Sequence, residues 1–389
     1  MAKNFDKVIN RRGTNSLKWD VGQNELPMWV ADMDFQTAPC VTQAVVAKAQ
    51  SGVFGYQIVP DSWYDAYINW WKSRHNLVIE KEWLCFCTGV VPAITSSIKR
   101  LTNVGDNVVV LTPVYDIFFH SIENTGRHVM ECPLAYDNGA YSIDFEALVA
   151  MLAEPLSTLL LLCNPHNPVG KVWGRSELAR IGELCAKHGV TVFSDEIHCD
   201  LTAPNVNYTP FAAASEVCNE ISVTAISASK AFNLAGLQSA AVFAASEHIR
   251  NKVVRGLNSD ELAEPNAFAV EAAVAAFSDE GASWLDGLRA HIAKNKATVA
   301  QFVAKNLPQI KIVEQDATYL MWLDCSAITD NASLLRAFIR EATGLYTNSG
   351  SYYRGNGRYF IRLNVACPEA TLKDGLNRLK EGIGKFTSR

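Results

Sequence analysis

The sequence lacks any uninterrupted apolar run close to the roughly 20 residues that a membrane-spanning helix requires. Residues 1–13, MAKNFDKVINRRG, also lack the apolar core of a secretory signal. Basic residues are not in excess, because the formal net charge is −5, so nothing in the charge favours nucleic acid as a partner. We therefore expect a soluble, cytoplasmic protein that binds neither membrane nor nucleic acid.

Spacings typical of disulfide frameworks or metal sites are also missing. The ten cysteines include no CxxC pair and are scattered through apolar segments. In a chain of this size, such cysteines are usually small core residues in a reducing compartment. CFC at 85–87 alternates as a strand would, so both thiols should face one way beside Phe86. No metal site is predicted.

What the chain does have is a large supply of core residues. Its 389 residues are 49% apolar and 19% charged, enough for two domains or for one large domain with a smaller partner. Between two β-rich runs, residues 176–189 have helical spacing, with Ser176 as the expected N-cap and Gly189 as the stop. The β-rich runs share near-continuous apolar character and polar ends: 106–113, 157–165, 190–197, 221–229 and 239–246.

Near-continuous apolar strands joined by helices indicate a mostly parallel sheet that is covered on both faces. Sites in such sheets gather at the carboxyl ends of the strands. From about residue 280 the pattern changes to longer helices and a few strands. We read this as a second, α+β lobe that the N-terminal segment joins.

Polar and ionisable groups stand where the apolar runs stop. The ends read TPVYD (112–116), CNPHNPVG (163–170), SDEIHCD (194–200) and SASK (227–230). Taken singly, each has an ordinary explanation: Lys230 as a surface ammonium, Asp195 as a turn cap, Asn167 as a turn residue between prolines. TGVVPAITSSIKRL (88–101) is good chemistry for a helix start and equally good for a phosphate cradle. Their joint occurrence, in this order, favours one shared site.

At this point the chain resembles the fold type I, pyridoxal-phosphate-dependent aminotransferase superfamily (class I/II), and within it the cystathionine β-lyase/C–S lyase branch. The resemblance runs from about residue 3 to 385. The stretches that carry it are MWVADMDF (28–35), GYQ (55–57), TPVYDIFFHSIENTGR (112–127), NPHNPVGKVW (164–173), DEIHCDL (195–201) and SASKAFNLAGLQSA (227–240).

The resemblance implies an α/β fold with two domains. A large domain over 44–279 would bind pyridoxal 5'-phosphate on a mostly parallel, seven-stranded sheet. A smaller α+β domain would consist of residues 1–43 and 280–389. The resemblance also implies a homodimer whose active sites are shared between the subunits.

The same resemblance assigns roles to the polar strand ends. Lys230 would form the Schiff base with the cofactor and then remove the substrate's Cα proton, which suits a lysine because its pKa shifts readily. Asp195 would pair with the protonated pyridine nitrogen. Tyr115 would stack on the ring, and Asn167 would donate to its phenolic oxygen. His198 stands where many relatives have a tyrosine near that oxygen.

The phosphate and the substrate's carboxylate need partners of their own. By resemblance, the phosphate partners are the backbone of Gly89, Val90 and Val91, the hydroxyls of Ser227 and Ser229, and Tyr56 from the neighbouring subunit. Gln238 replaces the arginine that classical aminotransferases carry there, so the phosphate lacks that partner. Arg362, in FIRLNVA, would bind the α-carboxylate as a planar fork, with Asn167 and the backbone of Ala31 beside it.

Three functions stay open at this level. A carbon–sulfur β-lyase would cleave L-cystathionine, L-cysteine or other S-substituted cysteines to pyruvate, ammonia and a thiol or sulfide. An aminotransferase would use the same lysine but return the proton to the cofactor. A regulatory protein could use the fold to contact a partner, although the complete set of catalytic residues argues against an inactive site. The features of the branch favour the lyase.

Overall fold

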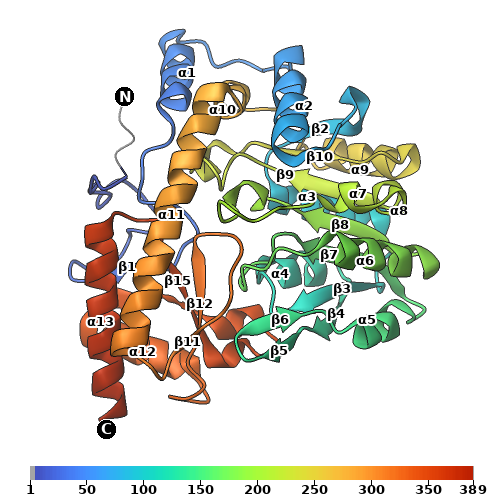
Figure 1. Ribbon diagram of the computed structural model, residues 1–389. Coiled ribbons are helices and arrows are strands. Elements are labelled where there is room, and N and C mark those ends of the chain that lie inside the picture. Colours follow the sequence, from blue (N-terminus) through green and yellow to red (C-terminus); the bar gives the residue numbers. More distant parts are fainter. Residues whose placement is uncertain (1–4, 389) are drawn as a thin grey trace.

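A seven-stranded sheet forms the centre of the computed structural model, which describes residues 5–388 (Figure 1). The strand order is β2-β10-β9-β8-β7-β3-β4, and β10 runs antiparallel to both of its neighbours while the other five strands from β9 to β4 are parallel. The prediction of a mostly parallel, seven-stranded sheet is confirmed. The strands are β2 (Leu84–Cys87), β3 (Asn107–Thr112), β4 (His128–Pro133), β7 (Ser157–Cys163), β8 (Thr191–Asp195), β9 (Ser222–Ile226) and β10 (Ala240–Phe243).

Helices cover both faces of this sheet, as β7 illustrates. Leu159 and Leu161 pack into the core cluster that contains residues of α3, α4 and α9. Leu160 and Leu162 pack into the opposite cluster, with residues of α5, α6 and α7. Alternate residues of one strand thus enter two cores, which explains the continuous apolar run. The helices near the sheet are α3 (Val90–Leu101), α4 (Ile117–Glu123), α5 (Phe145–Leu152), α6 (Arg175–Lys187), α7 (Phe211–Ala214), α8 (Glu216–Glu220) and α9 (Glu247–Ser259).

The start of α6 differs from the prediction. Ser176 is not the N-cap, because the helix begins at Arg175 and Gly174 precedes it. The Glu177 carboxylate accepts from the Gly174 N–H at 2.7 Å, so the side chain that closes the first turn comes from inside the helix. The expected stop is present: Gly189 follows the helix with a φ of +70°.

A second, four-stranded sheet lies in the C-terminal part of the chain, in the order β11-β12-β15-β14. Its strands are β11 (Lys311–Ile312), β12 (Leu320–Asp324), β14 (Asn348–Ser349) and β15 (Phe360–Asn364), and the long helices nearby are α11 (Asp279–Asn306), α12 (Ala332–Thr343) and α13 (Glu369–Thr387). The N-terminal segment joins this part through β1 (Leu26–Pro27), which pairs in parallel with β13 (Leu345–Tyr346). Strands far apart in the sequence therefore build this second lobe, while its boundaries along the chain stay a prediction.

The remaining elements belong to neither of these two sheets. They are α1 (Pro39–Gln50), α2 (Asp61–His75), α10 (Ala269–Ala276), the hairpin of β5 (Ala135–Asp137) and β6 (Ala140–Ser142), and the 3-10 turns η1 (Lys81–Trp83), η2 (Cys199–Leu201), η3 (Ala235–Leu237), η4 (Gly350–Tyr353) and η5 (Gly357–Tyr359). Residues 53–59 between α1 and α2 have no regular structure and expose several apolar side chains.

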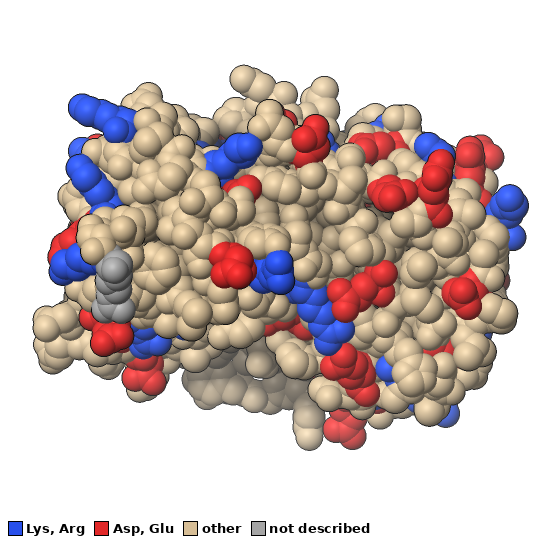
Figure 2. All heavy atoms as spheres, turned by 90° about the horizontal axis from the view of Figure 1, so that it is seen from below, with Lys and Arg blue, Asp and Glu red and all other residues tan. Residues whose placement is uncertain are grey.

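All ten cysteines are free, and eight of them are buried. Cys85 and Cys87 pack against the same core cluster, while Phe86 belongs to another, so the predicted alternation of CFC is confirmed. Between residues 5 and 388 no helix combines the length and apolar character needed to cross a membrane. On the face shown in Figure 2, acidic and basic side chains are interspersed rather than gathered by sign.

Candidate active site

A cavity of about 270 Å³ opens at the carboxyl ends of the central strands, where the sequence predicted a shared site. It lies beside the start of α3, the loops after β7, β8 and β9, and the N-terminal segment around Ala31. The residues that line it are Ala31, Thr88, Gly89, Val90, Val91, Pro92, Tyr115, Cys163, Asn167, Asp195, Ile197, His198, Ser229, Lys230, Ala235, Gln238 and Ser239.

Lys230 projects into this cavity from the turn that follows β9. Its Nζ donates to the carbonyl oxygen of Ala31 at 2.7 Å. Burial and the Arg362 guanidinium lower the pKa of the Lys230 amine to about 8, against the opposing effect of the Asp32 and Asp195 carboxylates. The uncharged fraction of the amine near neutral pH is thus larger than for an ordinary lysine, and the uncharged amine is the nucleophile.

Asp195 ends β8, the strand that pairs with β9, and lines the cavity. Its Oδ1 accepts from the Ile197 N–H at 3.1 Å. Burial raises the pKa of this carboxyl to about 7, and the neighbouring Glu196 adds to the shift, while the Ile197 N–H and Lys230 oppose it. A protonated ring nitrogen in the cavity would place a further positive charge beside this carboxylate.

The raised pKa of Asp195 makes a prediction about pH. A carboxyl whose pKa rises on folding contributes stability below its ordinary pKa of 3.8, and this contribution is lost as the pH rises through about 7. We expect cofactor-free wild type to lose on the order of 2–4 kcal/mol more stability than Asp195→Asn between about pH 4 and about pH 8. Urea unfolding of both cofactor-free proteins across this range is the measurement, and parallel pH dependences would contradict the assignment.

His198, Tyr115 and Asn167 add polar groups around the same cavity. Burial, with Lys230 and Arg362, lowers the pKa of His198 to about 3, so its imidazole is neutral, and its Nδ1 is buried without a hydrogen-bond partner in the described structure. Burial raises the pKa of Tyr115, which keeps the phenol protonated. The Asn167 amide oxygen accepts from Arg362 Nη1 at 3.2 Å. All three line the cavity, and their roles toward a cofactor stay predictions.

The N-terminus of α3 offers a phosphate cradle at one end of the cavity. Gly89, Val90 and Val91 line the cavity, and first-turn N–H groups of a helix have no partner within it. A Cβ on Gly89 would approach the ring of Pro92 to 3.2 Å, so the tight turn favours glycine. Gln238 also lines the cavity, in the place where the sequence departs from classical aminotransferases.

Of the two predicted phosphate-binding serines, only Ser229 lines the cavity. The Ser227 hydroxyl donates to the Ser239 carbonyl at 2.7 Å and accepts from the Ser229 N–H at 3.0 Å. Ser227 therefore orients the turn that carries Ser229, whereas its role toward a phosphate stays a prediction.

Arg362 comes from the second lobe and reaches the cavity from β15. It is buried, with Nη1 directed to Asn167 and Nη2 donating to the Trp29 carbonyl at 3.0 Å. Its Nε is buried without a hydrogen-bond partner in residues 5–388. A buried guanidinium with an unused donor is suited to a carboxylate, which accepts from two N–H groups at once.

Two predicted residues behave differently from the rest. Ala31 lines the cavity, but the group seen in contact is its carbonyl, which accepts from Lys230 and from the Tyr319 hydroxyl at 3.0 Å. Tyr56 is 98% exposed and does not line the cavity of its own chain. The structure thus gathers every predicted site residue at or beside the cavity except Tyr56.

Sequence reasoning missed several residues that line or adjoin the cavity. Thr88 precedes the predicted helix start, so its position was available as a signal. Cys163, Ile197, Ala235 and Ser239 offered none, because apolar residues and a lone serine at strand ends look like ordinary core or turn. Tyr319 is fully buried in the second lobe, and no local pattern connects it with Ala31.

A flat aromatic aldehyde that carries a phosphate and a ring nitrogen fits this set of groups. Lys230 offers the amine for the aldehyde, Asp195 the carboxylate for the nitrogen, and α3 the N–H groups for the phosphate. His198 Nδ1, which has no hydrogen-bond partner within residues 5–388, is a further polar atom at the cavity that a ligand would satisfy. A fold of this kind with such a site defines a pyridoxal-phosphate enzyme of fold type I.

Comparison with known proteins agrees with the geometry. The chain belongs to the aminotransferase class I and II family, whose model matches residues 21–379. Among curated relatives, cystathionine beta-lyase PatB of Bacillus subtilis is 42% identical over 98% of this chain and its own full length. Protein MalY of Escherichia coli is 33% identical, over 97% of this chain and 98% of its own.

Solved structures are also similar to this chain. The crystal structure of cystalysin from Treponema denticola, which contains a pyridoxal 5'-phosphate cofactor, has a TM-score of 0.95 and 30% identity, over 99% of this chain and 100% of that one. Pyridoxal 5'-phosphate is accordingly the cofactor of this protein.

Proposed function

We propose that this protein is a pyridoxal-phosphate-dependent carbon–sulfur β-lyase. Its substrates are L-cystathionine, L-cysteine or other S-substituted cysteines, and its products are pyruvate, ammonia and a thiol or sulfide. The observation that carries the proposal is the identity of 42% with cystathionine beta-lyase PatB over almost the whole chain. The residues that the chemistry requires are together at one cavity, which supports it further.

The chain's own residues divide the work. Arg362 binds the substrate's α-carboxylate through the fork that faces Asn167. Lys230, with its pKa near neutrality, takes the proton from Cα as general base. Asp195 holds the proton on the ring nitrogen and so keeps positive charge there. Pyridoxal phosphate, when bound, supplies the electron sink that makes this proton removable.

Tyr115 and His198 act without carrying charge. The Tyr115 phenol stays protonated and the His198 imidazole stays neutral, so both present dipoles rather than ions to the cavity. A neutral imidazole avoids repulsion with the Lys230 ammonium and the Arg362 guanidinium. We infer that these two residues orient the reacting groups rather than transfer charge.

A product assay separates the lyase from an aminotransferase, because Lys230 serves either reaction. Given L-cystathionine and no keto acid, the purified holoenzyme is expected to release pyruvate, ammonia and free thiol in equal amounts over many turnovers. Amino transfer only after a keto acid is added would instead make the protein an aminotransferase. Turnover in neither assay, with the cofactor bound, would favour the regulatory alternative.

We infer that the protein is a homodimer in which Tyr56 completes the active site of the other subunit. Val53, Phe54, Tyr56 and Ile58 are exposed by 71%, 58%, 98% and 80% in the single chain. Four such side chains within six residues are unusual on a solvated surface and are typical of a protein interface. A second copy of this chain would cover them and bring Tyr56 to a cavity.

Hybrid dimers test the shared site. A dimer of one Lys230→Ala subunit and one Tyr56→Ala subunit has one site with both defects and one site with neither. Random mixing of two nearly inactive variants should therefore restore about a quarter of the wild-type activity. Recovery is followed in the pyruvate assay after refolding the mixture, and each variant refolded alone is the control. A mixture no more active than its components would show that Tyr56 acts within its own chain or not at all.

We further infer that residues 44–279 form the large domain and that residues 1–43 and 280–389 form the small one. The pairing of β1 with β13 supports this division, while residues 1–4 and 389 lie outside the described residues. The cytoplasmic location stays a prediction; ten free cysteines are in keeping with it.

A further inference from the structure

The N-terminal segment 28–35 contacts the active site through its main chain. The Ala31 carbonyl accepts from Lys230, and the Trp29 carbonyl accepts from Arg362. One short stretch thus touches both the amine and the carboxylate-binding fork. Both contacts are made by main-chain carbonyls. The positions of these carbonyls therefore depend on how the segment itself is held.

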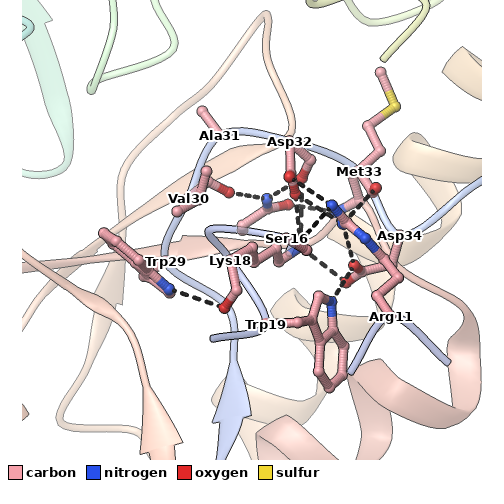
Figure 3. A network of polar contacts seen from close by, with 12 residues as sticks. Arg11, Ser16, Lys18, Trp19, Trp29, Val30, Ala31, Asp32, Met33 and Asp34 are labelled. Carbon is pink, nitrogen blue, oxygen red and sulfur yellow. Dashed lines mark hydrogen bonds and ion pairs between the residues drawn. The ribbon is translucent and has the colours of Figure 1, made fainter. Parts of the chain in front are cut away.

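Two basic side chains, Arg11 and Lys18, bind two carboxylates of the segment, Asp32 and Asp34 (Figure 3). Arg11 binds Asp32 through both of its terminal nitrogens, at 3.0 and 2.8 Å, and Asp34 at 2.8 Å. Lys18 Nζ lies 2.8 Å from Asp34 Oδ2 and 3.6 Å from Asp32 Oδ1. Two cations therefore face two carboxylates, and the charges balance.

Further hydrogen bonds fix the orientation of this charge network. Ser16 accepts from Arg11 Nη2 at 2.9 Å, and Trp19 Nε1 donates to Asp34 at 2.8 Å. Arg11 also donates to the Met33 carbonyl at 3.0 Å. The network consequently grips side chains and main chain of the segment together.

The network is largely removed from water. The Lys18 side chain is 1% exposed and that of Asp34 is 5% exposed, whereas Arg11 and Asp32 are each 21% exposed. Buried charges tolerate only arrangements in which each one is paired, because an unpaired charge in this environment is strongly unfavourable. The network therefore selects one position of the segment rather than merely adding to stability.

The other side of the segment is anchored by elements that carry the catalytic residues. Asn364, two residues after Arg362 on β15, donates to the carbonyls of Val30 and Asp32 at 2.6 and 2.7 Å. Asn233, three residues after Lys230, donates to the Met33 carbonyl at 2.9 Å and accepts from the Met33 N–H at 3.0 Å. The segment is thus held between the charge network and two asparagines, Asn233 and Asn364, that lie close in sequence to Lys230 and Arg362.

We propose that Asp32, clamped by Arg11 and Lys18, is a positioning residue of the reaction. It holds segment 28–35 so that the Ala31 carbonyl meets Lys230 and the Trp29 carbonyl meets Arg362. Asp32 touches neither substrate nor cofactor in this role and acts through the two carbonyls. The inference rests on the proposed function only for its kinetic consequence.

The charges around Lys230 give Asp32 a second readout. Arg362 and His198 face the amine from β15 and from the loop after β8, Asp195 faces it from β8, and Asp32 from the N-terminal segment. Arg11 and Lys18 lie behind Asp32. Burial and Arg362 lower the pKa of Lys230, and the Asp32 and Asp195 carboxylates raise it. Removing the negative charge of Asp32 would lower the pKa of Lys230 further. Moving the Ala31 carbonyl away from the amine would also lower this pKa.

Asp32→Asn is the variant for the first experiment, since it keeps the shape and one acceptor oxygen. With L-cystathionine as substrate we expect a fall in kcat/KM of roughly ten-fold or more, because small misplacements of reacting groups have large effects on rate. Both components should contribute: a higher KM through Arg362 and a lower kcat through Lys230. Lys18→Met should reproduce the loss, and Lys18→Arg, which keeps the cation, should restore much of it.

Glu25→Gln is the matched control. Glu25 lies just before segment 28–35, forms a two-pronged ion pair with Arg340 and is 21% exposed, as Asp32 is. Its partner lies in α12, away from the cavity. This variant should keep wild-type kcat/KM, so that the loss of an ion pair in general is separated from the loss of this one.

The second experiment needs no turnover. In cofactor-free protein, Lys230 is acetylated with trace acetic anhydride at a series of pH values, and the labelled peptide is measured by mass spectrometry. The midpoint of labelling should move to lower pH in Asp32→Asn and stay in place in Glu25→Gln. Thermal unfolding of each variant confirms that the protein compared is folded.

The two experiments distinguish a failure of the Asp32 proposal from a failure of the proposed function. An unchanged labelling midpoint together with kcat/KM equal to that of Glu25→Gln would overturn the proposal. If instead no protein, wild type included, turns over L-cystathionine, the proposed function fails while the labelling shift still tests Asp32. Should Lys18→Met not fold, the isosteric Asp32→Asn carries the test alone.

Discussion

Lys230→Ala is expected to lose nearly all turnover, by a factor of about 10³ or more, because the variant has no group to take the Cα proton. It should also lose the yellow colour that results from covalent attachment of the cofactor to the lysine. Among the described residues that line the cavity, Lys230 is the one amine, and its pKa is lowered to about 8. Pyruvate release and the visible absorption spectrum, both on purified protein, are the measurements.

Lys296 provides a matched control for this experiment. Burial also lowers the pKa of Lys296 to about 8, and its Nζ donates to the Ala317 carbonyl at 2.9 Å. It lies on α11 and does not line the cavity. Lys296→Ala should therefore keep both colour and activity. Substantial turnover by Lys230→Ala, or equal losses in the two variants, would contradict the assignment of Lys230.

Arg362→Lys should have the second-largest effect, although it keeps the charge. A lysine ammonium cannot donate to a carboxylate, to the Trp29 carbonyl and to Asn167 in one plane, as the guanidinium does. We expect kcat/KM to fall roughly 30- to 1000-fold, equivalent to about 2–4 kcal/mol, mainly through KM. Steady-state kinetics with L-cystathionine measure this, and the cofactor's absorption should persist.

Arg358→Lys is the corresponding control. Arg358 is an arginine of the same part of the chain, but it lies beside Tyr359 at the surface and is no part of the cavity. Its replacement should leave kcat/KM unchanged. If Arg362→Lys altered kcat alone, with KM at the wild-type value, the guanidinium would act on the reaction rather than on the substrate's carboxylate.

Much of the site could be predicted because its residues stand where apolar strands end. Asp195, Asn167 and Lys230 are polar residues at the carboxyl ends of β8, β7 and β9, and parallel strands bring these ends to one edge. Their individual roles, however, came from the resemblance, since a strand-end carboxylate or asparagine usually only caps a turn. The expected strands were longer than those observed; 164–165 and 227–229, for example, lie in loops that carry the site.

Contacts between remote segments could not be predicted in the same way. Lys18 stands between Leu17 and Trp19, and no local pattern in the sequence predicts its burial, yet its side chain is 1% exposed. Lys18 can be buried because it pairs with Asp34 and lies close to Asp32. These residues are remote in the sequence, so no local spacing predicts the contact. The start of α6 was misplaced for a related reason: Ser176 is a good N-cap by type, but the reach of the Glu177 side chain back to Gly174 decided the boundary.

The site combines residues that are far apart in the sequence. Its functional groups therefore leave the ribosome at different times during synthesis. Lys230 meets a carbonyl that is 199 residues upstream, and Arg362 meets one that is 333 residues upstream. A nascent chain that has emerged as far as α10 already contains the amine, the aspartate and the phosphate cradle, but not the guanidinium. Since β15 follows all the other strands in the described part of the chain, the group for substrate recognition emerges only after them. A product truncated before β15 would keep the groups that hold the cofactor without the group that admits an amino acid.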